Sequence, residues 1–183
     1  GLKINGANYF TMNSLVGFTL GMGLPEHNLQ AADKARLSAL FYFKHLEHRT
    51  IQIGVSRLEL WGHNEINERI HFLPDGSLAA LIGSPLGEVC WQTLQDALLN
   101  PVTVGQFELP WDGRFILLWV SADGKRWTMW NDWLGSMPVY HAEVEGGRLA
   151  STLEPVTVAG TGYGPDDFFL PGLVSLLING HFI

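Results

Sequence analysis

Hydrophobic residues fill both alternating faces of the segment Arg114–Val120. One face carries Phe115, Leu117 and Trp119, and the other carries Ile116, Leu118 and Val120. An antiparallel strand with one face in water alternates apolar with polar residues instead. The pattern therefore predicts a strand that is buried on both faces, in a sheet that has a further layer on each side.

Turn residues divide the following region into more strands. Asp123-Gly124 favours a hairpin reversal because glycine accepts a positive φ. Strands are predicted over residues 127–132, 137–144 and 148–152, with turns at Leu134-Gly135 and Gly146-Gly147. We interpret residues 111–154 as a four-stranded antiparallel meander.

Helical spacing of apolar residues predicts a long helix in the first third of the chain. Asn28 is its expected N-cap, and the stripe runs from Leu29 to about Arg49. A second, short helix is predicted over Cys90–Asn100 and a third over Phe168–Ile178. Residues 159–165 are rich in glycine and indicate a linker.

Alternation and turn residues predict the remaining strands. They cover residues 13–20, 50–60, 70–73 and 78–82, with a turn at Pro74-Asp75-Gly76. Residues 61–69 are mostly polar, which favours an exposed segment.

Composition and charge narrow the classes of function. The chain has 183 residues, 46% of them hydrophobic, which suits one domain with a sizeable core. The formal charge of −7 argues against nucleic acid as a partner. No apolar run is long enough to span a bilayer. The single cysteine, Cys90, excludes an intrachain disulfide and fits a reducing compartment, so we expect a cytoplasmic protein with no membrane partner.

An ordered series of short motifs carries a family resemblance. The series is Asp112-Gly113-Arg114-Phe115, Asn131-Asp132 with Gly135, Pro138-Val139-Tyr140, and Ala150-Ser151 with Glu154. It resembles the glutaminase (class II glutamine amidotransferase) domain of asparagine synthetase-like enzymes, with the pattern G-x-F-A-F, R-D-x-x-G-x-x-P-L-Y-Y and a-S-E. Asn131 stands where the family has arginine, and glutamate does not directly follow Ser151. The alternative is a generic antiparallel meander.

The resemblance implies an α+β fold of the N-terminal-nucleophile hydrolase type. This is a four-layer αββα sandwich, in which two antiparallel sheets are flanked by helices. It divides the chain into an N-terminal extension (1–11), a glutaminase-like domain (12–165) and a helical lead-in (166–183) to a C-terminal ligase-like domain. ATP and Mg would belong to that ligase domain, and no cofactor or metal is expected in this chain. The ligase domain is the expected partner, and a homodimer stays open.

The same resemblance implies that the catalytic residues are gone. The nucleophilic cysteine of the family falls on Met12, Asn13 or Ser14, and none of these is cysteine. The oxyanion asparagine falls on Ile82-Gly83-Ser84 or on Leu86-Gly87-Glu88, each with an aliphatic residue at the amide position. No counterpart of the family's G-S-D segment lies between Asn100 and Trp111.

The substrate contacts that survive in this comparison are few. Arg57 resembles the family arginine that grips the glutamine α-carboxylate, and Gly83 and Ser84 are the accompanying candidates. The oxyanion amide alone supplies a factor on the order of 10²–10³ in rate. Because both this amide and the nucleophile are missing, we expect no glutamine hydrolysis. The hypothesis is a degenerate glutaminase-like domain that serves as a scaffold or substrate-pocket wall.

Other functions remain open at this level. Exposed tryptophans, with Trp61, Trp111 and Trp133 near turns, would suit a stand-alone binding module. Cys90 as a relocated nucleophile would suit an active amidotransferase, although a small buried residue is the simpler interpretation. His45 and His48 could share a metal with Glu47 or His71, but seven scattered histidines make such pairs common by chance. Residues 160–164 lack the lysine of a phosphate loop.

Overall fold

The computed structural model of the protein describes residues 15–63, 66–86, 90–99, 109, 111–144 and 146–163. Within these ranges the fold is α+β, with a mixed sheet of nine strands and three α-helices. The strands are β1 (Leu15–Met22), β2 (Glu47–Ile53), β3 (Ser56–Gly62), β4 (Ile70–Phe72), β5 (Leu78–Leu86), β6 (Asp112–Val120), β7 (Trp127–Asn131), β8 (Tyr140–Val144) and β9 (Gly147–Ser151). The helices are α1 (Glu26–Ala39), α2 (Trp91–Leu99) and α4 (Glu154–Thr161), and η1 (Ile66–Arg69) is a 3-10 turn.

Strand β1 joins two groups of strands. It pairs antiparallel with β3 on one side and with β9 on the other, while β2 extends β3 and β8 extends β9. We call these five strands the β1 group. The β6 group comprises β4, β5, β6 and β7, paired in that order. Among the described residues, the two groups are linked by one parallel pairing, Leu15 of β1 with Ile82 of β5.

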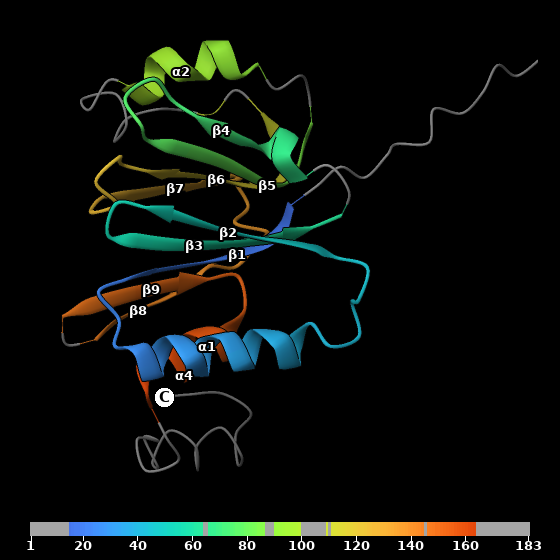
Figure 1. Cartoon of the computed structure of the whole chain (residues 1–183). Helices are drawn as coiled ribbons and strands as arrows, with labels where there is room; N and C mark the ends of the chain where they lie inside the picture. The colour runs from blue at the N-terminus through green and yellow to red at the C-terminus, as the bar shows by residue number, and fades with distance from the viewer. Residues whose placement is uncertain are drawn as a thin grey trace, which may run out of the picture.

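The two groups face each other, and helices lie outside them. Figure 1 shows α2 beyond the β6 group, and α1 and α4 beyond the β1 group. The inner core between the groups consists of apolar side chains from both, including Phe18, Leu60, Ile82, Ile116 and Leu118. A second cluster, with Leu94 and Leu98 of α2, packs on the outer face of the β6 group.

The prediction for residues 114–120 is confirmed. Ile116, Leu118 and Val120 lie in the inner core, whereas Leu117 and Trp119 pack in the cluster under α2. The turns at Asp123-Gly124 and Gly146-Gly147 are also present, with φ of 73° at Gly124 and 77° at Gly146. A strand with two buried faces is thus covered by the other strand group on one side and by a helix on the other.

The predicted four-stranded meander is wrong at one junction. β6 pairs with β7 and β8 pairs with β9, but β7 does not pair with β8. Instead the chain crosses from the β6 group to the β1 group, where β9 pairs with β1. Turn residues signal a change of direction, but they do not specify which strand receives the next one.

The first helix is shorter than predicted. It covers Glu26–Ala39, and Asn28 lies inside it, buried, where its side-chain amide donates a hydrogen bond to the carbonyl of Gly160 at 2.9 Å. Residues 47–53 form β2 because their backbone pairs with β3. The apolar stripe that suggested a longer helix continues into Phe41 and Phe43, which are exposed.

Three further predictions are corrected. Residues 50–60 are not one strand, because Gly54, with φ of 51°, reverses the chain between β2 and β3. Residues 61–69 are not generally exposed, since Trp61 and Ile66 are buried. Residues 159–161 belong to α4 and not to a linker, and the helix ends at Gly162 in the left-handed conformation. The predicted helix at 168–178 and the extension at 1–11 lie outside the described residues.

Two hairpin turns, one from each strand group, interlock. The N–H of Val55 donates to the carbonyl of Asp123 at 3.0 Å, and the hydroxyl of Ser56 donates to the carbonyl of Gly124 at 2.5 Å. The indole N–H of Trp127 in turn donates to the Ser56 hydroxyl at 2.9 Å. The bond from Ser56 is buried and the bond from Trp127 is partly buried, so they help to fix how the two groups meet at this end of the molecule.

We expect Gly124→Ala to destabilise the protein far more than Gly135→Ala. Both glycines have positive φ, but a Cβ at Gly124 would lie 2.1 Å from the carbonyl oxygen of Ile53, whereas one at Gly135 meets nothing within 4 Å. Gly135→Ala should lower the free energy of unfolding by about 1 kcal/mol, and Gly124→Ala should lower it by about 3 kcal/mol or more. Urea unfolding measures both, and equal losses would contradict the interlocked turns.

Candidate functional site

Three of the residues that carry the family resemblance, Phe115, Asn131 and Asp132, take part in hydrogen bonds at the crossing between β7 and β8. Asp132, just after β7, is buried and accepts hydrogen bonds with both carboxylate oxygens. Oδ1 accepts from the N–H groups of Leu134 at 3.1 Å and Ser136 at 3.2 Å. Oδ2 accepts from the Ser136 hydroxyl at 2.7 Å and from the N–H of Phe115 at 3.4 Å. Asp132 therefore ties the crossing loop to β6.

These hydrogen bonds also determine the ionisation of Asp132. Burial acts to raise the pKa of this carboxyl group, but the bonds from Ser136, Phe115 and Leu134 outweigh it and hold the pKa below its ordinary value. The carboxylate form is thus the form that the loop binds. Its acceptor positions are taken by the protein itself, so this aspartate is suited to a structural role.

Neighbouring motif residues complete the same junction. The side-chain amide of Asn131, at the position of the family's arginine, donates to the carbonyl of Met137 at 3.1 Å. Gly83 in β5 has φ of 87°, and a Cβ there would lie 2.3 Å from the carbonyl oxygen of Arg114 and 2.7 Å from Sδ of Met137. A side chain is therefore excluded at position 83, which explains the glycine by packing alone.

No residue at the implied oxyanion position has a side-chain amide that could donate a hydrogen bond. Ile82 is fully buried in the inner core and pairs with Leu15 at the beginning of β1. Ser84 is exposed two residues further along β5. In the alternative alignment, Leu86 is exposed, while Gly87 and Glu88 lie outside the described residues, as do Met12, Asn13, Ser14 and the segment 100–108.

Arg57 lies apart from Gly83 and Ser84. In the pairing of β1 with β3 it stands opposite Gly21, whereas Gly62 stands opposite Leu15 near the beginning of β1. The distance along β1 from Leu15 to Gly21 is about 20 Å at the usual rise per residue. The structure thus places Gly83 and Ser84 near the beginning of β1 and Arg57 toward its other end.

Arg57 is also engaged by other residues. One terminal nitrogen lies 3.1 Å from Oδ2 of Asp33 in α1 and 2.7 Å from Oε1 of buried Glu59. Burial acts to lower the pKa of Arg57, but the charges of Glu59 and Asp33 raise it overall. Glu59 also accepts hydrogen bonds from Thr50 and His48, and these together with Arg57 keep its pKa low in spite of burial. This network joins α1 to β2 and β3.

Cys90 is exposed immediately before α2, so its interpretation as a small buried residue is wrong. Of the histidines proposed to share a metal, His45 stacks on His63, His48 binds Glu59, and His71 stacks on Trp91. The proposed ligands therefore point to different partners. Within the ranges that the structure describes, no three His, Cys, Asp or Glu side chains gather as metal ligands would.

The proposed patch of exposed tryptophans is not formed as predicted. Trp61 is only 2% exposed and packs against Gly17, while Trp133 is 79% exposed and Trp111 is partly buried against Phe115. The turn after Trp61 suggested exposure, but its ring covers the outer face of β1. Trp133 alone of these three presents a mostly exposed ring.

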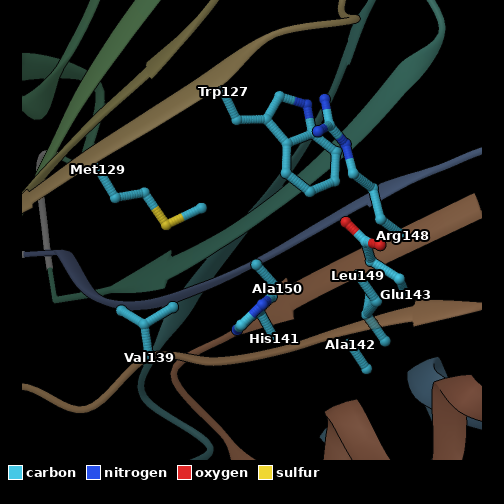
Figure 2. A pocket seen from close by; sticks show the side chains of 9 residues that line it. All are labelled: Trp127, Met129, Val139, His141, Ala142, Glu143, Arg148, Leu149 and Ala150. Atoms are coloured by element: carbon cyan, nitrogen blue, oxygen red, sulfur yellow. The ribbon is translucent and has the colours of Figure 1, made fainter. Parts of the chain in front are cut away.

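A cavity of about 340 Å³ lies between β7 and the β8–β9 hairpin. Figure 2 shows Trp127 and Met129 on one side and His141, Ala150 and Val139 on the other, with Arg148 and Glu143 toward one end. Ala142 and Leu149 complete the lining. The guanidinium of Arg148 lies over the ring of Trp127, 4.3 Å from its centroid.

Sequence reasoning missed this cavity because alternation along β8 shows only that its polar residues are exposed. His141 and Glu143 alternate with Ala142 and Val144, which places the polar pair in solvent, and both are exposed in the structure. His141 pairs with Ala150 and Glu143 with Arg148, and these side chains also border the space toward β7. Alternation along one strand does not show which neighbouring strand completes a pocket.

Comparisons with known proteins add no family. Neither the protein-family models nor the curated protein sequences give a match to this chain. Among the described helices, none combines the length and the apolar character needed to cross a bilayer.

We expect Asp132→Asn to lower the free energy of unfolding, and to lower it more at neutral than at acidic pH. Because the pKa of Asp132 is lower in the folded protein than the unfolded value of about 3.9, its stabilisation is fully present above about pH 5. It is lost as the pH falls below 4 and through the folded pKa. The free energy of unfolding of the wild type should exceed that of Asp132→Asn by about 2 kcal/mol at pH 7, and this difference should shrink at pH 3.

Urea unfolding at the two pH values measures this difference. Asp96→Asn, at an exposed position in α2, is the matched control and should change little at either pH. A difference of the same size at pH 3 and pH 7 would contradict the role assigned to the Asp132 carboxylate.

Proposed function

We propose that the chain is a degenerate glutaminase-like domain of an asparagine synthetase-like protein. It has lost glutamine hydrolysis and serves as a scaffold or substrate-pocket wall for an ATP-dependent, amide-forming domain. The proposal includes the finer fold description, a four-layer αββα sandwich of the N-terminal-nucleophile hydrolase type. In related families with such a front domain, the ligase half forms an amide or a ring from an adenylated carboxylate.

One observation carries the proposal. Motif positions shared with the family, at Gly83, Phe115 and Asp132, meet at one junction and are explained by packing and hydrogen bonds. The position that should supply the oxyanion amide holds Ile82, a fully buried aliphatic residue. Retention of the structural positions together with loss of the reactive one is typical of a domain kept for its shape.

The arrangement of helices and strands supports the same proposal. The inner core lies between the β1 group and the β6 group, with α2 outside one and α1 and α4 outside the other. Such layers are the expected frame of the hydrolase fold. Arg57, the candidate substrate contact, is held by Asp33 and Glu59, and its contact with substrate stays a prediction.

The DNA sequence downstream of the codon for Ile183 tests the assignment. An S-G-G-x-D-S pyrophosphate loop encoded in frame within the following domain would support an amide-forming partner. A stop codon immediately after Ile183 would instead support the stand-alone binding module, for which the exposed ring of Trp133 is the main observation.

We expect the purified chain to release no ammonia from L-glutamine above background. Ile82→Asn should not restore turnover, because the nucleophile is missing as well as the amide. An enzyme-coupled ammonia assay measures this release, with heat-denatured protein as the blank. Turnover well above background that Cys90→Ser abolishes would contradict the proposal and favour an active amidotransferase with a relocated thiol.

A further inference from the structure

The inner face of the sheet changes character at the β8–β9 hairpin. Elsewhere this face carries the apolar side chains of the inner core, with Ala150 of β9 among them. At the hairpin it carries His141, Glu143 and Arg148 instead, around the 340 Å³ cavity. The cavity is open to solvent, because His141 and Glu143 are exposed. A pocket that combines apolar side chains with a few polar groups is the usual make-up of a small-molecule site, and its volume lies in the usual range.

Arg148 is a fixed positive charge at one end of this cavity. Its guanidinium stacks on Trp127 at 4.3 Å and donates a hydrogen bond to the carbonyl of Lys125. Among the described residues, no carboxylate lies within ion-pair distance of it. Because the side chain is already held in place, little conformational entropy is lost when an anion binds to it.

Glu143 supplies the opposite charge on the same wall. It is the direct cross-strand partner of Arg148, so their Cβ atoms are about 5 Å apart, yet the described side chains form no ion pair. An anionic ligand alone would be repelled by Glu143, and a cationic one by Arg148. A molecule that bears a carboxylate and an ammonium group on one carbon matches both.

The rest of the lining is apolar and of suitable size. Trp127, Met129, Val139 and Ala150 surround the space in Figure 2. An apolar cavity of about 150 Å³ is enough for benzene, so about twice that volume holds a benzyl side chain together with its α-carbon groups. We propose that this cavity binds a small α-amino acid with an apolar side chain. The inference rests on the cavity and does not depend on the proposed function.

Three related probes test this with the full ¹⁵N-labelled chain. They are L-phenylalanine, 3-phenylpropanoate, which lacks the ammonium group, and 2-phenylethylamine, which lacks the carboxylate. The reporter is the indole N–H signal of Trp127, assigned with Trp127→Phe. We expect saturable shifts with L-phenylalanine at a Kd on the order of 1 mM, and at least about fivefold weaker binding of each analogue.

Two variants separate the two charges. Glu143→Gln should make L-phenylalanine bind no better than 3-phenylpropanoate, and Arg148→Gln should make it bind no better than 2-phenylethylamine. Arg126→Gln is the matched control, since that guanidinium lies over Trp119 at 5.7 Å, outside the cavity lining. It should leave the order of the three probes unchanged.

Several outcomes would overturn the proposal. They are the absence of saturable binding of L-phenylalanine, equal binding of all three probes, or an unchanged preference in Glu143→Gln. Glu143 is exposed and makes no ion pair with a described residue, so this variant should fold even if Arg148→Gln does not. Dispersed amide signals confirm the fold in each case.

Discussion

The carboxylate of Asp132 holds the point at which the chain passes from one strand group to the other. It accepts hydrogen bonds from the amide of Phe115 in β6 and from Leu134 and Ser136 in the crossing loop. A buried carboxylate is costly unless such donors surround it, so the loop and the charge stabilise each other. Asn131 and Met137 continue the contact toward Gly83 in β5. The relation between the two groups thus depends on a few polar contacts as well as on the apolar core.

Much of the fold could be predicted from local patterns. The doubly buried strand β6, the turn at Gly124 and the short helix α2 all follow from residues within one segment. The end of α1 could not be predicted in this way, because the stripe through Phe41 and Phe43 resembles a helix while residues 47–53 pair with β3. The crossing between β7 and β8 is likewise a choice between distant partners, which a turn dipeptide does not encode.

The candidate site was predictable only where a motif marked it. Ile82 lies opposite the beginning of β1, Asp132 binds the crossing loop, and Gly83 packs against Met137 of that loop. Their contacts account for all three as structural residues. Arg57 matched a motif by its neighbours in sequence, but its register against Gly21 places it elsewhere. The cavity gave no sequence signal, because His141 and Glu143 alternate along β8 as the exposed residues of any solvent-facing strand do.

Native-state hydrogen exchange at Leu134 and Ser136 tests most directly whether Asp132 acts as a structural anchor. Both amides donate to its carboxylate, although they belong to a loop that carries the exposed side chains of Trp133 and Leu134. We expect both amides to exchange slowly in the wild type near neutral pH and rapidly in Asp132→Asn. Rapid exchange of both amides in the wild type would contradict the anchoring role and, with it, the explanation of the shared motif as structural.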